Sequence, residues 1–133
     1  MVKAKAQWID GERFTASASS GHAIVVDSDR ASNTASGPME LVLMALCACT
    51  STDVVIVLNK KRQPFTSLSV RAEAERAAEP PTVYTQIKLI YSIGGKVDRD
   101  AMEKAVKLSE ERYCSVSQML QKTAKISWEI EYL

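Results

Sequence analysis

The segment "SGPMELVLMALCACTSTDVVIVLNK", residues 36–60, predicts a long helix at the centre of the fold. Pro38 lies just inside the expected start, with Ser36 as the candidate N-cap, and Pro64 prevents continuation beyond about Lys61. Apolar side chains occupy almost every side of this helix, which would be about 36 Å long at a rise of 1.5 Å per residue. Because one sheet covers only one side of such a helix, we expect a second copy of the chain to cover the other, in a homodimer.

Strands are expected both before and after this helix in the sequence. Residues 1–27 alternate polar and apolar side chains and contain turn signals at Asp10-Gly11 and Ser20-Gly21, which predicts a three-stranded meander. The polar segment Ser28–Ser36 has no periodicity and is expected to be a loop. After the helix we expect strands over 68–75 and 83–93, helices over 99–113 and 115–123 capped by Asp98 and Ser115, and a last strand over 124–133. This order predicts a single α+β domain over residues 1–133.

The overall composition is that of an ordinary globular protein. Hydrophobic residues make up 46% of the 133 residues, charged residues make up 25%, and the net charge is +1. This balance favours neither nucleic acid nor a membrane surface as a partner. The polar residues Thr50 to Asp53 interrupt the apolar segment 41–58, which argues against a membrane span. Three cysteines and no signal-peptide pattern indicate a reducing cytoplasm.

The three cysteines are the residues that carry most of the functional information. Cys47 and Cys49 lie two residues apart, so on a helix their side chains project about 200° from each other. They can therefore neither form a disulfide together nor share one metal ion while the helix stays intact. His22 is the only histidine, and the spacing C-x-C is not the usual C-x-x-C of zinc ligands. We expect no metal site and no cofactor.

Two alternatives remain open for these thiols. Free cysteine packs as a small hydrophobic residue, which is the preferred interpretation for Cys47, between Leu46 and Ala48. Cys114 lies at the expected start of a helix, where the helix dipole and free N–H groups stabilise a thiolate. A reactive pair of Cys49 and Cys114 requires that the fold bring them together, which the spacing alone does not prove.

The segments "SGPMELVLMALCAC", residues 36–49, and "EERYCSVSQML", residues 110–120, resemble the OsmC family, which includes the organic hydroperoxide resistance proteins. That family has a proline-opened central helix with a cysteine eleven residues after the proline, a position that Cys49 occupies here. Its second cysteine precedes a short helix in a setting similar to Cys114-Ser115-Val116-Ser117. The resemblance covers nearly the whole chain and is greatest to the YhfA-like branch.

The resemblance implies a thiol-dependent hydroperoxide reductase of the peroxiredoxin kind, active in the response to oxidative stress and built as an intertwined homodimer. Cys49 would be the peroxidatic nucleophile, which becomes a sulfenic acid, and Cys114 would be the resolving thiol. A dithiol reductant would restore both thiols by exchange. An apolar pocket at the subunit interface would favour alkyl or lipid hydroperoxides as substrates.

The sequence departs from the family pattern next to Pro38. Characterised peroxidases of the family have a glutamate directly after this proline, paired with an arginine, whereas this chain has Met39. Glu40 follows, but one residue rotates a helical side chain by about 100°. Arg30 lies within about one position of the arginine in one subgroup and is either that arginine or a solvated loop residue. Asp53, four residues after Cys49, either orients the thiol or is a hydrogen-bonded polar residue of the helix.

A second function is compatible with the same pattern. Met39 in place of the glutamate favours a non-catalytic dimer that binds a small apolar ligand or acts as a thiol redox sensor, whereas the retained pair Cys49 and Cys114 favours the peroxidase.

Overall fold

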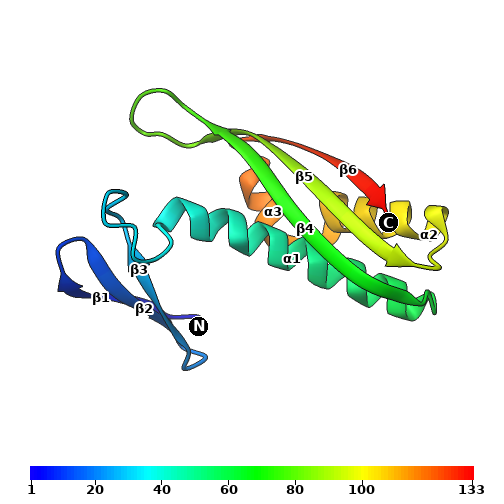
Figure 1. Ribbon diagram of the computed structural model, residues 1–133, viewed down its shortest axis with the longest axis horizontal. Coiled ribbons are helices and arrows are strands. Elements are labelled where there is room, and N and C mark those ends of the chain that lie inside the picture. Colours follow the sequence, from blue (N-terminus) through cyan, green and yellow to red (C-terminus); the bar gives the residue numbers. More distant parts are fainter. The chain divides into compact units, whose positions relative to one another are not determined.

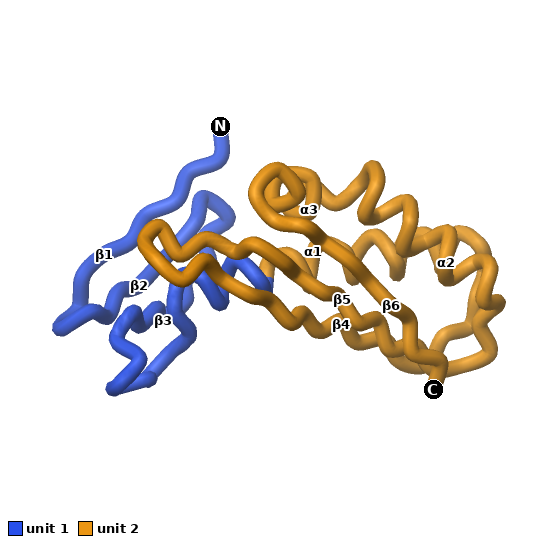
Figure 2. Tube along the Cα trace, turned by 90° about the horizontal axis from the view of Figure 1, so that it is seen from above, with its two compact units in different colours: residues 1–44 blue, residues 45–133 orange.

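The computed structural model describes all residues, 1–133, and the chain divides into two compact units (Figures 1 and 2). The first unit comprises residues 1–44 and the second comprises residues 45–133. The long helix α1, Pro38–Lys60, runs through the boundary between them. The elements occur in the order β-β-β-α-β-β-α-α-β expected from the sequence, with an added π-helical turn between the last two helices. The α+β fold class is therefore confirmed.

The first unit contains the expected meander. Strands β1 (Ala4–Asp10), β2 (Arg13–Ala18) and β3 (Ala23–Asp27) pair antiparallel in the order β1-β2-β3. The first hairpin turns at Gly11, where φ is +48°, a conformation that suits glycine. Every residue of β1 is exposed, including the large side chain of Trp8.

The loop between β3 and α1 is ordered by one buried carboxylate. Asp27 accepts hydrogen bonds from the Ser32 hydroxyl at 2.7 Å, from the Thr34 hydroxyl at 2.6 Å and from the Thr34 amide at 3.0 Å. The Asp29 amide donates a fourth, at 2.9 Å. These donors, the Thr34 hydroxyl above all, hold the pKa of Asp27 far below its usual range. The segment is thus a loop, as expected, but a tightly bonded one.

The start of α1 differs from the prediction in its cap. Gly37, not Ser36, directly precedes the first helical residue, Pro38. The Gly37 amide donates to Glu40 Oε1 at 3.0 Å, so the third helical residue reaches back to the cap position as in a capping box. The expectation of a Ser36 cap is therefore wrong. Gly37 occupies the N-cap position, and the capping hydrogen bond joins its amide to the Glu40 carboxyl group.

Only one stripe of α1 is buried, formed by Leu46, Thr50, Val54 and Leu58. These residues are spaced four apart and therefore share one face of the helix. By length and composition alone α1 is also long and apolar enough to cross a membrane. A single helix of this kind is weak evidence for a span, since the core helix of a soluble protein passes the same test.

The second unit is a three-stranded sheet with helices on one face (Figure 1). Strands β4 (Phe65–Arg76) and β5 (Tyr84–Gly95) pair antiparallel, and β6 (Lys125–Tyr132) joins β5 in parallel, so β5 is central. The parallel crossover is made by α2 (Arg99–Leu108), the π-helical turn η1 (Ser109–Tyr113) and α3 (Ser115–Leu120). The core lies between β5 and these helices and includes Ile87, Leu89, Met102 and Val106.

The C-terminal helices correct three details of the prediction. The helix expected over 99–113 ends at Leu108, and its last turn widens into η1. Asp98 occupies the N-cap position of α2, but its side chain makes no capping hydrogen bond. The N-cap of α3 is Cys114, whose sulfur accepts from the Ser117 amide, and Ser115 is instead the first helical residue.

We predict that Leu89→Ala lowers the free energy of unfolding by about 2–5 kcal/mol, because it leaves a cavity in the centre of β5. Leu89 is fully buried and lies between Ala72 of β4 and Trp128 of β6. Urea unfolding followed by circular dichroism measures the change. In the control Val83→Ala, at a side chain that is 37% exposed, we expect a loss below about 1 kcal/mol. Equal losses in the two variants would contradict the assignment of the core.

Candidate functional site

The second unit brings two of the three thiols together. Cys49 is half-buried on α1, and Cys114 is fully buried between η1 and α3. Burial raises the pKa of Cys114 well above its usual value of 9.0, and the Ser117 amide opposes this rise. A hydrogen bond with Cys49 and the charge of Cys49 raise the pKa further. Cys114 therefore keeps its proton at neutral pH.

A buried carboxyl group lies beside this pair. Glu110 of η1 is 6% exposed, and its Oε1 accepts from the Tyr91 hydroxyl at 2.7 Å and from the Thr50 hydroxyl at 3.0 Å. Its Oε2 accepts from the Ser117 hydroxyl at 2.8 Å. Burial, followed by the charge of Glu110, raises the pKa of Tyr91 far above its usual value, so this phenol stays protonated and donates. Three hydroxyl groups from α1, β5 and α3 thus replace the water that a carboxyl group normally binds.

The hydrogen bonds around Glu110 continue through Thr50 and Ser109 to Asp53. Thr50 Oγ1 lies 2.5 Å from the Tyr91 hydroxyl and 2.8 Å from the Ser109 hydroxyl, and Ser109 donates to Asp53 Oδ2 at 2.8 Å. Asp53 is therefore hydrogen-bonded, as one of the two interpretations from the sequence expected. We define the hydroxyl cluster as the side chains of Thr50, Tyr91, Ser109, Glu110 and Ser117.

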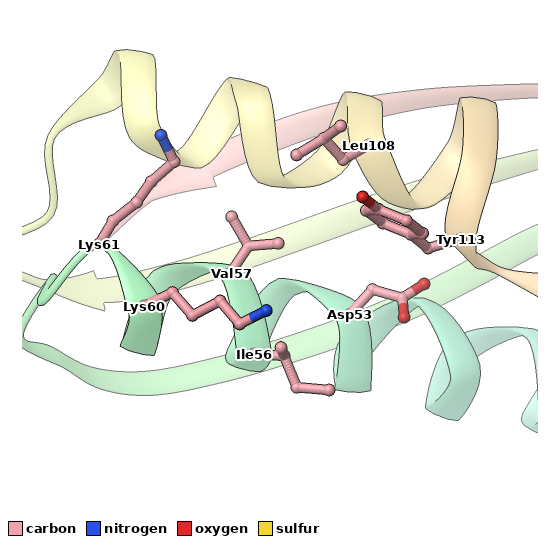
Figure 3. A pocket seen from close by; sticks show the side chains of 7 residues that line it. All are labelled: Asp53, Ile56, Val57, Lys60, Lys61, Leu108 and Tyr113. Atoms are coloured by element: carbon pink, nitrogen blue, oxygen red, sulfur yellow. The ribbon is translucent and has the colours of Figure 1, made fainter.

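Asp53 also lines a pocket of about 580 Å³ between α1 and the α2–η1 segment (Figure 3). Its carboxyl group projects toward Tyr113 across the gap between the two helical segments. The remaining lining residues are Ile56, Val57, Lys60, Lys61 and Leu108. The pocket therefore has apolar walls with two lysines at the end of α1, a combination suited to a molecule with an apolar body.

The other predicted residues have different surroundings. Cys47 is half-buried, and burial raises the pKa of its thiol. In the first unit, Arg30 Nη1 lies 2.8 Å from Glu40 Oε1, while its Nη2 donates to the backbone carbonyls of Asp27 and Ala35. Arg30 is thus tied to the loop and to the first turn of α1 rather than simply solvated. No group of three or more histidine, cysteine or acidic side chains is arranged to hold a metal ion.

Sequence reasoning did not identify Glu110, Tyr91, Thr50, Ser109 or Ser117. One signal was present: Thr50 interrupts the stripe Leu46, Val54, Leu58 at a position where a core residue is expected. A polar side chain at such a position must find buried partners. The π-helical turn that carries Glu110 is also a feature found frequently at functional sites.

Comparisons with known proteins agree with this architecture. Residues 31–129 match the model of the family described as "OsmC-like protein". Protein YhfA of Escherichia coli strain K12 is 38% identical over 131 residues, which cover 98% of this chain and 97% of YhfA. The crystal structure of a hypothetical protein from Aquifex aeolicus VF5 has 32% identity and a TM-score of 0.86, over 100% of this chain and 98% of that one.

The same fold occurs in a more distant protein. An organic hydroperoxide resistance protein from Legionella pneumophila has 19% identity and a TM-score of 0.73, over 98% of this chain and 96% of its own.

We predict that iodoacetamide at pH 8 modifies Cys49 before Cys114. Cys114 is fully buried and its raised pKa keeps it protonated at this pH, whereas alkylation requires the thiolate. Raising the pH above 9 must therefore accelerate modification of Cys114. Peptide mapping by mass spectrometry follows each thiol, with a urea-unfolded sample as the control. Faster modification of Cys114 than of Cys49 at pH 8 would contradict the described environment.

Proposed function

The chain belongs to the OsmC-like protein family, and we propose that it is a thiol-dependent peroxidase that reduces organic hydroperoxides through Cys49 and Cys114. The single observation that carries this proposal is the interaction of the two thiols inside the second unit. The hydroperoxide resistance protein with the same fold supports the reaction class.

The proposed reaction has three steps. The Cys49 thiolate attacks the distal oxygen of the hydroperoxide; the O–O bond breaks, an S–O bond forms, and the departing alkoxide takes up a proton to give the alcohol. The Cys114 thiol then attacks the sulfenic sulfur of Cys49; the S–O bond breaks, the disulfide forms, and the thiol proton leaves with the hydroxide as water. A dithiol reductant restores both thiols by two exchange steps.

The surroundings of the sulfurs support this division of roles. Cys49 is half-buried and can meet a substrate, whereas Cys114 is fully buried and can meet only a group that is already inside the unit. Asp53 lies one helical turn after Cys49 and lines the apolar pocket. We propose that this pocket favours alkyl or lipid hydroperoxides over hydrogen peroxide. Asp53 remains a candidate for orienting Cys49.

We also propose that the protein is a homodimer in the cytoplasm. Of the 23 residues of α1, only Leu46, Thr50, Val54 and Leu58 are buried, while Met44 and Ile56 are 54% and 49% exposed. Exposed apolar side chains also occur on the meander, namely Trp8, Ile9, Ile24 and Val25. A second copy of the chain would remove both groups of side chains from water.

A second candidate function has its own support. Met39 occupies the position of the family glutamate, and the pocket of about 580 Å³ is large enough for a small apolar ligand. A non-catalytic dimer would use this pocket for binding and the thiols as a redox sensor.

We predict that the native protein consumes cumene hydroperoxide in the presence of dithiothreitol or a lipoyl reductant, and that Cys49→Ser abolishes this turnover. The matched control is Cys47→Ser, the same substitution two residues away, which is expected to change the rate less than about twofold because Cys47 has no role in the proposed steps. Loss of the hydroperoxide is measured with a ferrous-dye assay. Absence of turnover with either reductant would favour the binding protein, and a large loss in Cys47→Ser would show that the wrong cysteine was assigned.

We predict that the protein sediments as a dimer and that Ile56→Asp weakens it. A charge on the exposed side of α1 is costly to bury against a second copy, whereas Lys60→Asp, near the solvated end of the same helix, serves as the control. Sedimentation velocity over a concentration series measures the dissociation constant. A stable monomer of the native chain would contradict the proposed dimer.

A further inference from the structure

Glu110 makes contacts that its neighbour Glu111 does not. Both follow Ser109 in the turn η1, but Glu110 is 6% exposed whereas Glu111 is exposed. No lysine or arginine pairs with Glu110; its carboxyl oxygens are bound only by hydroxyl groups. Its backbone carbonyl also accepts from the side-chain amides of Gln118 and Gln121, each at 2.8 Å.

Two of the hydroxyl donors connect Glu110 to the thiols. Thr50 directly follows Cys49 on α1, so its bond to Glu110 holds the helical turn that carries the first sulfur. Ser117 donates its hydroxyl to Glu110 and its backbone amide to the sulfur of Cys114, at 3.3 Å. One carboxyl group thus holds the backbone beside both sulfurs, from two elements that are more than 60 residues apart.

The groups that act on Cys114 come from three elements. They are Ser117 of α3, Cys49 of α1 and Glu110 of η1, and no cationic side chain is among them. Tyr91 of β5 donates to Glu110 Oε1, the oxygen that also accepts from Thr50. Burial is the largest cause of the raised pKa of Cys114, and the interaction with Glu110 acts in the same direction.

We propose that Glu110 is the positioning residue that assigns the two thiols their roles: through Thr50 it fixes the turn of α1 that carries Cys49, the nucleophile, and through Ser117 it fixes the segment that carries Cys114, the resolving partner. The resolving role of Cys114 rests on the proposed peroxidase reaction. In that reaction, this arrangement prevents a hydroperoxide from oxidising the buried sulfur of Cys114 first. The assignment itself concerns the resting dithiol protein and needs no peroxide.

The test measures the pH dependence of Cys114 alkylation in Cys49→Ser protein, with and without Glu110→Gln. Removal of the charge is expected to move the midpoint of the profile to lower pH. The rate of Cys114 modification at pH 8 then rises by about tenfold for each pH unit by which the midpoint falls. The plateau rate at high pH is expected to stay the same, because the thiol is then fully ionised in both proteins. Iodoacetamide is the probe, and peptide mapping separates Cys114 from Cys47.

Two control variants distinguish this role from a merely structural one. Thr50→Val removes one donor of the hydroxyl cluster but keeps the charge, so it measures how far a loosening of the fold alone moves the midpoint, and Glu110→Gln is expected to move it further. Glu111→Gln removes the neighbouring exposed charge and is expected to leave the profile within about twofold, since water screens it. Folding of each variant is checked by circular dichroism.

The proposal is overturned if Glu110→Gln leaves the midpoint unchanged, if it raises the rate equally at all pH values, or if Glu111→Gln moves the midpoint equally far. Failure of the peroxidase assay, with the midpoint still lowered by Glu110→Gln, would overturn the proposed reaction and leave the assignment of the thiols standing.

Discussion

The packing of the second unit depends on the hydrogen bonds that hydroxyl groups donate to Glu110, a carboxyl group buried without a cation beside it. Glu110 is only 6% exposed, and a buried carboxyl group without hydrogen-bond donors costs several kcal/mol or more. The chain meets this cost with the hydroxyl groups of Thr50, Tyr91 and Ser117. These donors belong to three separate elements, so the hydrogen bonds to Glu110 link α1, β5 and α3.

The position of the thiols follows from this arrangement. Cys49 precedes Thr50 on α1, and the Cys114 sulfur accepts the Ser117 amide. Thr50 and Ser117, the neighbours of the two sulfurs, thus donate to the same carboxyl group. Burial then separates the two thiols chemically, one half-buried and one fully buried.

Local patterns were sufficient to predict much of the fold. The alternation in β4, the proline at the start of α1 and the order of the elements all depend on residues close together in the chain, and the structure has each of them. The alternation expected in β5 is wrong over residues 89–94, because this central strand is buried on both faces there. The caps were predicted less well. Ser36 and Gly37 are neighbours and either could be the N-cap of α1, and the choice depends on the Glu40 side chain, which binds the Gly37 amide. The π-helical turn has no sequence pattern of its own and appeared only as a continuation of α2.

The site was predicted only as far as the cysteines. Cys49 could be selected over Cys47 because the resemblance to the family counts from Pro38, a local relation. The hydroxyl cluster joins Thr50 to Tyr91, Ser109 and Glu110, partners 41, 59 and 60 residues away, and no local periodicity connects them. Serine and threonine on a helix are common, so their burial becomes informative only when the opposing element is known.

The proposed chemistry requires that Cys49 and Cys114 reach each other, and the most direct measurement is a peptide map of the Cys47→Ala protein after one equivalent of a mild thiol oxidant. The map is made under non-reducing conditions, and mass spectrometry identifies the cross-linked peptides. We predict one disulfide, within the chain, between Cys49 and Cys114. Recovery of both cysteines unlinked, with Cys49 oxidised beyond the sulfenic acid, would contradict the pairing of these thiols.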